Sequence, residues 1–253
     1  SRPDVTVDEI AAAVDVLRSG WWTTGPKVNE FEGKIADYLR YDEPLFAAGL
    51  NSCTAGLHLS LLVMGIGEGD EVIVPTWTFA ATSQVVEWIG ARLVLCDIEE
   101  DNLNIDLKKA EKLITSRTKA IIPVHIAGYP CNMDALKELS EKYGLAIIED
   151  AAHAIGTKYK GKKIGNFSDL TVFSFYATKN LAMGEGGIVV SKDRSLIEKI
   201  RKISYFGINK EAFKRYEKAG NWFYDIEETG FKYNLDSVHA AIGLVQLERL
   251  DAM

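Results

Sequence analysis

The stretch Glu71-Val-Ile-Val-Pro75 begins a regular alternation of short apolar segments and helical patterns. The apolar segments predict strands at 93–97, 120–125 and 146–150, and the patterns between them predict helices at 79–89, 107–114 and 133–143. Short apolar strands that alternate with helices are typical of a mainly parallel sheet with helices on both faces and right-handed crossovers. The sequence therefore predicts an α/β fold.

The segments before this alternation are predicted to be helical. Thr6-Val-Asp-Glu9 is a capping-box pattern, and Ser19-Gly20 ends the helix that it opens. A second amphipathic stretch covers residues 28–39, and a third helix follows Thr54. The turn Gly67-Glu-Gly-Asp70 then leads into the first strand of the alternation.

The composition favours a protein that handles small molecules. The 253 residues are 47% hydrophobic and 26% charged, which is enough apolar content for a large core. A net charge of −7 and a pI near 5.3 argue against binding to nucleic acids or anionic membranes. No stretch approaches the roughly 18 apolar residues of a membrane span and no secretory signal pattern is present, so we expect a cytoplasmic protein.

The cysteines and histidines predict neither a disulfide framework nor a metal site. Cys53, Cys96 and Cys131 form no CxxC pair and are expected to be core or pocket-lining thiols. The four histidines are scattered along the chain and have no zinc-ligand spacing.

Polar residues follow several of the predicted strands. Parallel sheets bind their ligands at the carboxyl ends of the strands, so the segments after the strands form the candidate site. These segments are 75–79, Asp97, His125, 150–153 and 174–179.

Lys179 has the setting of a reactive amine. It follows the apolar run 170–175, which predicts a buried strand, and it precedes the glycine-rich turn Gly184-Glu-Gly-Gly187. A lysine becomes nucleophilic toward a carbonyl when desolvation or neighbouring cations lower its pKa, and a strand end in a cleft suits that role. Taken alone, these residues also fit a surface lysine in a β-turn.

Five motifs together resemble the DegT/DnrJ/StrS family of nucleotide-sugar aminotransferases. The motifs occur in the family's order over the whole chain, and the segment Trp22-Thr-Thr-Gly25-Pro before them is also similar to the family. The five motifs are Asn51-Ser-Cys-Thr-Ala-Gly-Leu57, Gly69-Asp-Glu-Val-Ile-Val-Pro75, Glu149-Asp-Ala-Ala-His-Ala-Ile-Gly156, Ser174-Phe-Tyr-Ala-Thr-Lys179-Asn and Gly230-Phe-Lys-Tyr-Asn234. The resemblance implies a dimer of fold type I enzymes dependent on pyridoxal 5′-phosphate (PLP), with a mainly parallel sheet of about seven strands. Residues 1–253 would be the PLP-binding large domain and the start of a helix leading to a C-terminal small domain that the sequence lacks.

The resemblance assigns the catalytic residues. Lys179 would form the internal Schiff base and shuttle a proton, and Asp150 would keep the pyridine nitrogen of PLP protonated. Glu149 competes for that role, but strand alternation places the two carboxylates on opposite faces. A helix N-cap is the other interpretation of Asp150. His153 matches a family position near the phenolic oxygen of PLP, although a lone histidine is more often structural.

The phosphate of PLP needs hydrogen-bond donors. Ser52 to Gly56, at the start of an apolar helix, offer small residues and free N–H groups, so the Thr54 hydroxyl and the Ala55 amide are the expected contacts, unless the segment is a plain helix cap. By resemblance, Ser174 supplies a second phosphate-binding hydroxyl.

Two further positions complete the cofactor site that the resemblance implies. Phe79 matches the aromatic residue that stacks on the ring of PLP, and Trp77 is its rival because the two would share a strand face if the strand continues. Asn234 matches a residue that reaches the phosphate of the partner subunit's PLP, which implies a shared active site in a homodimer.

The reaction that the resemblance implies is a transamination. An amino group moves from L-glutamate to PLP and then to the keto carbon, expected to be C4, of a nucleotide-linked sugar used in cell-envelope or secondary-metabolite glycans. The nearest type by motif is the enzyme that makes UDP-4-amino-4-deoxy-L-arabinose. One alternative is a PLP-dependent sugar dehydratase, but that branch replaces the lysine with histidine, and Lys179 argues against it. A non-catalytic, regulatory family member is the other alternative.

Overall fold

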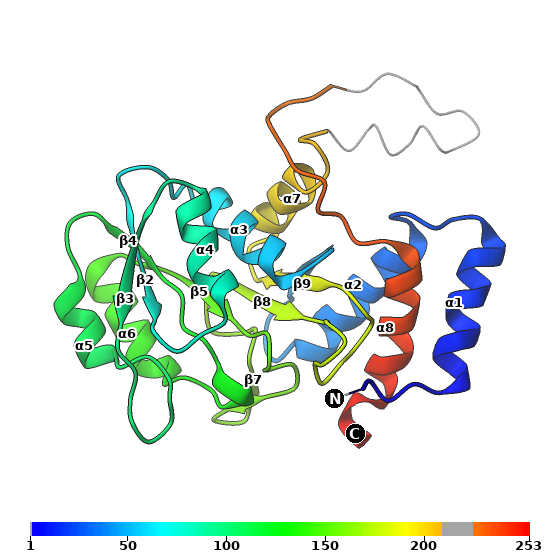
Figure 1. Ribbon diagram of the computed structural model, residues 1–253, viewed down its shortest axis with the longest axis horizontal. Coiled ribbons are helices and arrows are strands. Elements are labelled where there is room, and N and C mark those ends of the chain that lie inside the picture. Colours follow the sequence, from blue (N-terminus) through cyan, green and yellow to red (C-terminus); the bar gives the residue numbers. More distant parts are fainter. Residues whose placement is uncertain (1, 209–224) are drawn as a thin grey trace.

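A seven-stranded sheet runs through the computed structural model, which describes residues 2–208 and 225–253 (Figure 1). The strands of this sheet are β1 (Phe46–Leu50), β2 (Glu71–Pro75), β3 (Arg92–Cys96), β4 (Thr118–Ile121), β5 (Ala146–Asp150), β8 (Leu170–Ser174) and β9 (Gly187–Ser191). The helices are α1 (Val7–Ser19), α2 (Pro26–Leu39), α3 (Cys53–Val63), α4 (Ala80–Trp88), α5 (Leu107–Leu113), α6 (Met133–Tyr143), α7 (Arg194–Ile203) and α8 (Ser237–Arg249). A small hairpin, β6 (Lys158–Tyr159) and β7 (Lys162–Lys163), and the short turns η1 (Ile126–Gly128) and η3 (Leu250–Ala252) complete the described elements.

The sheet is parallel except for one strand. Its order is β1-β9-β8-β5-β4-β2-β3, and β9 pairs antiparallel with both β1 and β8. The other neighbouring strands pair parallel. Because β9 runs against the rest, it begins at the edge where the other strands end. The predicted mainly parallel sheet of about seven strands is thus confirmed.

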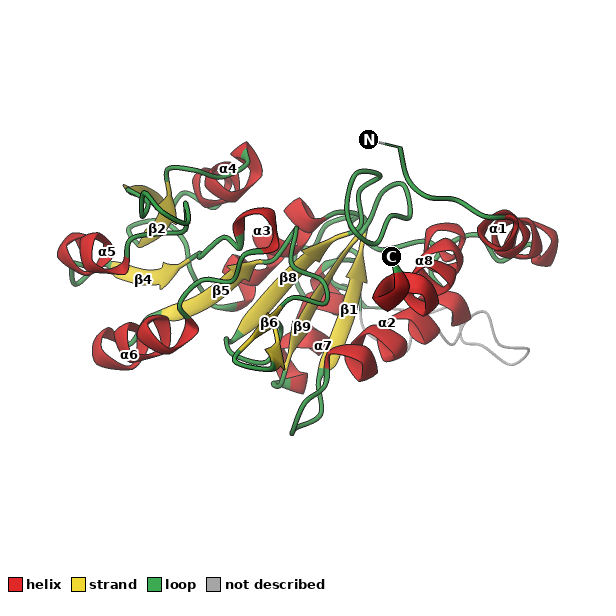
Figure 2. Cartoon of the chain, turned by 90° about the horizontal axis from the view of Figure 1, so that it is seen from below, coloured by secondary structure: helices red, strands yellow, loops and turns green. Residues whose placement is uncertain are grey.

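Helices cover both faces of the sheet (Figure 2). Alternate residues of each strand contribute to two separate cores, as Ile147 and Ile148 of β5 illustrate. The first core packs α2, α5, α6 and α8 against one face, and the second packs α3, α4 and α7 against the other. Two buried faces explain why the strands are apolar throughout rather than alternating.

Helix α1 packs against α8 at the side of the sheet (Figure 1). The predicted capping box is present, since the Thr6 N–H donates to the Glu9 carboxylate at 2.7 Å, and the helix ends at Gly20 in the left-handed conformation. Glu9 also accepts from Gln246 and Arg249 of α8, each at 2.7 Å. Burial alone would raise the pKa of Glu9, but hydrogen bonds from Thr6 and Gln246 outweigh it and lower that pKa to about 2.

Two sequence expectations need correction. The strand predicted at 120–125 ends at Ile121, because Pro123 has no N–H for a ladder; a single bridge from Val124 to Asp150 continues the alignment. Strand β2 ends at Pro75, so Trp77 and Phe79 do not share a strand face.

No helix within the described ranges has the length and apolar character to cross a membrane.

Candidate active site

The predicted site segments meet at the carboxyl edge of the sheet. Strand β5 ends at Asp150 and β8 ends at Ser174, and Lys179 lies in the loop that joins β8 to β9. At the start of β9, Gly187 is in register with Leu50 on one side and Ser174 on the other. The topology therefore gathers residues that are far apart in the chain at one edge.

Lys179 and Asp150 both act electrostatically on His153 and on Cys53. Partial desolvation lowers the pKa of His153; the positive charge of Lys179 lowers it further, and Asp150 partly opposes both. Asp150 and Lys179 also act on Cys53: burial raises the pKa of its thiol well above the ordinary value, Asp150 adds to this and Lys179 opposes it. His153 is thus a neutral imidazole at neutral pH, and Cys53 is a protonated thiol.

Lys179 is half-buried in a tight turn. Its N–H donates to the carbonyl oxygen of Tyr176 at 2.9 Å, which closes the β-turn that the sequence allowed. Within the described residues, no hydrogen bond or ion pair engages its ammonium group. The amine is therefore held at the sheet edge by its backbone and is available to a ligand.

The carboxylate of Asp150 is buried and held by two donors. The side chain of Thr82 donates to Oδ2 at 2.7 Å, and the N–H of Ala152 donates to Oδ1 at 3.2 Å. The Thr82 hydroxyl is in turn 2.7 Å from that of Thr78. Residues 151–157 form turns, so Asp150 is not a helix cap. Thr78 lies in the predicted site segment 75–79, but Thr82 was not among the predicted site residues, although the segment Pro75-Thr-Trp-Thr-Phe79-Ala-Ala-Thr is rich in hydroxyls.

Glu149 is committed to the other side of the strand. It is fully buried and accepts hydrogen bonds from His125 Nε2 at 2.7 Å, from Thr171 at 2.8 Å and from Ser168. Ile147, two residues earlier, belongs to the core under α6, whereas Ile148 belongs to the core under α3 and α4. Strand alternation thus separates Glu149 from Asp150, as the sequence predicted.

The geometry at His125 assigns its tautomer. Its Nδ1 accepts the N–H of Cys131 at 3.1 Å, so Nε2 carries the ring proton that is donated to Glu149. The Glu149 carboxylate favours a charged imidazole and burial opposes one, but a second proton on Nδ1 would point at the Cys131 N–H. His125 is therefore a neutral imidazole, and its hydrogen bond to Glu149 ties β5 to the chain after β4.

The first turn of α3 and Gly187 of β9 face each other across what we call the cradle, the predicted phosphate site. Ser52 caps the helix by accepting the Ala55 N–H at 3.1 Å. The predicted Ala55 donor is therefore already engaged, and the N–H groups of Cys53 and Thr54 are those without an intrahelical acceptor. Thr54 is half-buried at this wall.

Gly187 of β9 forms the opposite wall of the cradle, and its lack of a side chain lets β9 lie close to the start of α3. A Cβ at Gly187 would lie 2.5 Å from the amide nitrogen of Cys53 and 2.6 Å from the Ser52 carbonyl oxygen, so a larger residue does not fit. Ser174, in register with Gly187, is buried, and its hydroxyl accepts the Tyr176 N–H at 3.4 Å. Ser174 and Gly187 are therefore neighbours on adjacent strands at the sheet edge, and the binding of a phosphate by Ser174 and the start of α3 stays a prediction.

The candidate ring-facing residues are both exposed. Phe79 is 80% exposed and is the N-cap residue of α4, and Trp77 is 58% exposed in the preceding loop. Phe79 lies between Thr78 and Thr82, so its backbone is linked to Asp150 through the two hydroxyls. The choice of Phe79 as the ring-stacking residue remains a prediction.

Asn234 lies at the same edge as the cradle. It forms a bridge with Leu50, and its side chain donates to the Thr24 hydroxyl at 2.7 Å and accepts from Lys232. These bonds orient Asn234 within its own subunit, and its contact with a partner's cofactor remains a prediction.

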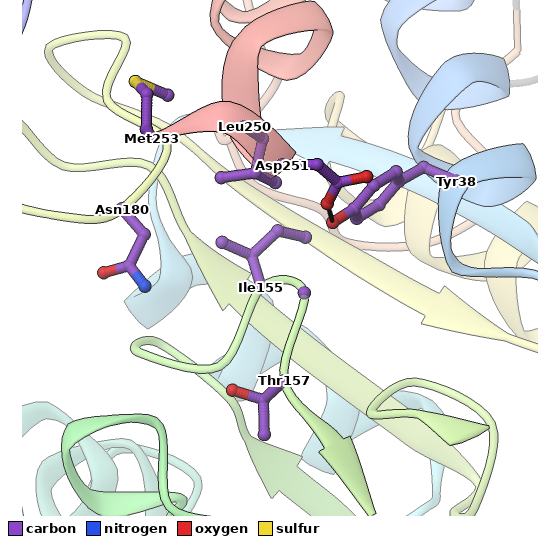
Figure 3. Close-up of a pocket in the computed structure, with 8 residues that line it drawn as sticks. Tyr38, Ile155, Thr157, Asn180, Leu250, Asp251 and Met253 are labelled. Carbon is purple, nitrogen blue, oxygen red and sulfur yellow. Dashed lines mark hydrogen bonds between the residues drawn. The ribbon is translucent and has the colours of Figure 1, made fainter. Parts of the chain in front are cut away.

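An open hollow of about 460 Å³ lies next to the site (Figure 3). One side contains Asn180, which follows Lys179, and Ile155, two residues after His153. The other side contains Tyr38, whose hydroxyl donates to Asp251 at 2.6 Å. The hollow is open to solvent.

The residues fit PLP by shape and by chemistry. The cradle is lined by N–H and hydroxyl donors and has no room for a Cβ at Gly187, as a phosphate site requires. Asp150 provides a buried carboxylate and Lys179 an amine at the same sheet edge, as a protonated pyridine nitrogen and an aldehyde require. A mainly parallel sheet with these groups at its carboxyl edge defines the large domain of the fold type I PLP-dependent transferases.

The chain belongs to the DegT/DnrJ/EryC1/StrS aminotransferase family, whose family model matches residues 3–253. Members of this family depend on PLP. The family that the sequence motifs suggested is thereby confirmed.

Similar proteins from bacteria and archaea match the whole chain. It is 48% identical over 252 residues to the uncharacterized protein MJ1066 of Methanocaldococcus jannaschii and 46% identical over 253 residues to the spore coat polysaccharide biosynthesis protein SpsC of Bacillus subtilis. Both matches cover 100% of this chain and 64% of the relative. The chain thus spans 64% of the length of these curated relatives.

A solved structure matches the fold closely. The PMP-form of Spr1654 from Streptococcus pneumoniae has a TM-score of 0.93 at 38% identity, over 100% of this chain and 67% of that chain. The same protein has also been solved in a PLP-form.

Proposed function

We propose that the full-length protein is a PLP-dependent aminotransferase that moves an amino group from L-glutamate to the keto carbon, at C4, of a nucleotide-linked sugar. The observation that carries the proposal is that the Lys179 amine and the Asp150 carboxylate both act on His153 and on Cys53, which adjoins the cradle closed by Gly187. Family membership and the polysaccharide role of the Bacillus subtilis relative support a sugar substrate.

The chain's own groups perform distinct parts of this reaction. PLP, when bound, supplies an aldehyde that accepts the amino group and a ring that withdraws electrons from the carbon that loses its proton. Lys179 anchors the cofactor through Nζ and moves the proton to and from that carbon. Asp150 holds the proton on the ring nitrogen, and Thr54 and Ser174 bind the phosphate. In the first half-reaction a water supplies the keto oxygen of the 2-oxo acid that leaves, and in the second the keto oxygen of the sugar leaves as water.

We further propose a homodimer in which Asn234 completes the site of the partner subunit. Its place beside the cradle, with Thr24 and Lys232 fixing its amide, supports a role at a subunit boundary. Asn234→Ala and Lys179→Ala proteins should each be inactive alone. Refolding them together should restore part of the activity, because one mixed site then keeps both residues; no recovery would place Asn234 in its own subunit's site.

The function is tested with the full-length protein, PLP, glutamate and a panel of UDP-, dTDP- and GDP-linked 4-keto and 3-keto sugars, with amine products identified by mass. We expect a yellow protein that aminates a 4-keto sugar, and loss of the visible band in Lys179→Ala. A colourless protein that stays colourless with added PLP contradicts the proposal. Turnover of a sugar without gain of nitrogen indicates a dehydratase, and amination of a 3-keto sugar alone moves the position to C3.

A further inference from the structure

The two threonines behind Asp150 form a hydrogen-bonded chain with a defined direction. Thr82 is fully buried and has a single hydroxyl proton, which it donates to Asp150 Oδ2 at 2.7 Å. The hydroxyl of Thr82 must therefore accept in its other bond, so Thr78 is the donor across the 2.7 Å between them. The direction is Thr78 to Thr82 to Asp150, and we call these two threonines the hydroxyl relay.

The relay spans two strands of the sheet. Thr78 and Thr82 follow β2, whereas Asp150 ends β5, and β4 lies between these strands. Thr82 is also in the first turn of α4, where its N–H donates to the Phe79 carbonyl oxygen at 3.1 Å. The segment that carries Phe79 is consequently bonded to the Asp150 carboxylate through one side chain.

The relay leaves Asp150 oriented rather than merely buried. Oδ2 is held by Thr82 and Oδ1 by the Ala152 N–H, so the carboxylate plane is fixed from two sides. Hydrogen bonds to an ionised carboxylate are stronger than neutral ones, and a donor that is itself hydrogen-bonded is strengthened further. Lys179, His153 and Cys53 are the titratable groups that act on the same site, and none of them holds the carboxylate in place.

We propose that Thr82 is a positioning residue that aims Asp150 at the ring nitrogen of PLP and fixes the Phe79 segment relative to it, with Thr78 acting only through Thr82. The inference rests on the proposed function. It predicts that the Thr82 hydroxyl, and not its bulk, determines how tightly PLP binds and how fast glutamate donates its amino group.

The test uses the full-length protein and five variants. Thr82→Val removes the hydroxyl and keeps the shape, Thr82→Ser keeps the hydroxyl, and Thr78→Val and the double valine variant probe the direction of the relay. Ser83→Ala is the matched control, because Ser83 follows Thr82 in α4 and lies outside both the relay and the site segments. The measurements are the PLP dissociation constant by absorbance titration and the kcat and KM of the half-reaction with glutamate.

We expect Thr82→Val to weaken PLP binding and to lower kcat by roughly tenfold to hundredfold, with little change in the KM for glutamate. Thr82→Ser and the Ser83→Ala control should stay within about threefold of wild type, which is about 0.65 kcal/mol. Thr78→Val should have a smaller effect and add nothing to Thr82→Val. Because Thr78 is only half-buried, its variant tests the relay even where Thr82→Val fails to fold.

Three results overturn the inference. They are wild-type behaviour of Thr82→Val, equal losses in Thr82→Val and Thr82→Ser, and additive effects of the Thr78 and Thr82 valine variants. A wild-type protein that binds no PLP overturns the proposed function and the inference with it, whereas normal wild-type binding with any of the three results overturns the inference alone.

Discussion

Replacing Gly187 with alanine should break the packing on which the cradle depends. The new methyl carbon would lie 2.5 Å from the Cys53 nitrogen and 2.6 Å from the Ser52 oxygen, both backbone atoms, so β9 and the start of α3 must separate by about 1 Å. Overpacking of this kind costs about 1–3 kcal/mol, and backbone neighbours place it at the upper end. Alanine regains about 0.5–1 kcal/mol through a less flexible unfolded chain, which leaves a net loss of about 2 kcal/mol.

The assay is urea unfolding followed by tryptophan fluorescence, with the free energy of unfolding extrapolated to water. PLP affinity, measured by absorbance titration, should fall by about tenfold or more, because the separation removes donors from the phosphate. Gly33→Ala is the matched control: Gly33 is exposed inside α2 with no atom within 4 Å of a built Cβ, so the free energy of unfolding should rise by about 0.5–1 kcal/mol. Equal stability of Gly187→Ala and wild type would refute the reasoning.

Three further outcomes are expected. Glu149→Gln should lower the free energy of unfolding by about 1–3 kcal/mol in urea, since an NH₂ group would face a buried donor, whereas Glu138→Gln on the exposed side of α6 should be neutral. The pKa of Glu9 falls from 4.5 to about 2 in the folded protein, so its contribution is complete above pH 4.5 and disappears as the pH drops toward 2. The stability difference between wild type and Glu9→Gln should therefore shrink across that interval in urea titrations, and a constant difference contradicts the assignment. Asp150→Asn should keep the visible band of lysine-bound PLP but lose most amino transfer in a stopped-flow assay with glutamate; near-normal rates would move the ring-nitrogen role to another residue.

The sheet and its edge were predictable because both depend on local patterns. Strand β5 and helix α6 match the residues that the sequence indicated, since each is bounded by a clear cap or turn. The separation of Glu149 from Asp150 also follows from strand alternation alone. These features need no knowledge of what packs against them.

The hydroxyl relay was not predictable, because its partners are distant in the chain. Thr82 and Asp150 are 68 residues apart, and a threonine early in a helix has no local feature that indicates a buried carboxylate partner. The helix start predicts the Ala55 amide as a phosphate donor, and its N–H also donates to the Ser52 hydroxyl at 3.1 Å, so its contact with a phosphate stays a prediction. Local side-chain caps compete with ligands for the same N–H groups, and only the geometry shows which wins.

The reversed strand β9 has a consequence for how the protein folds. Two adjacent parallel strands need a long crossover, whereas β8 and β9 are joined at one edge by the loop of residues 175–186 that contains Lys179. Contacts between near neighbours in the chain form early, because little chain entropy is lost in closing a short loop. We therefore expect the hairpin that holds Lys179 to form before β1 joins β9 from far away in the sequence, so that the reactive amine is in place before the phosphate cradle is assembled around it.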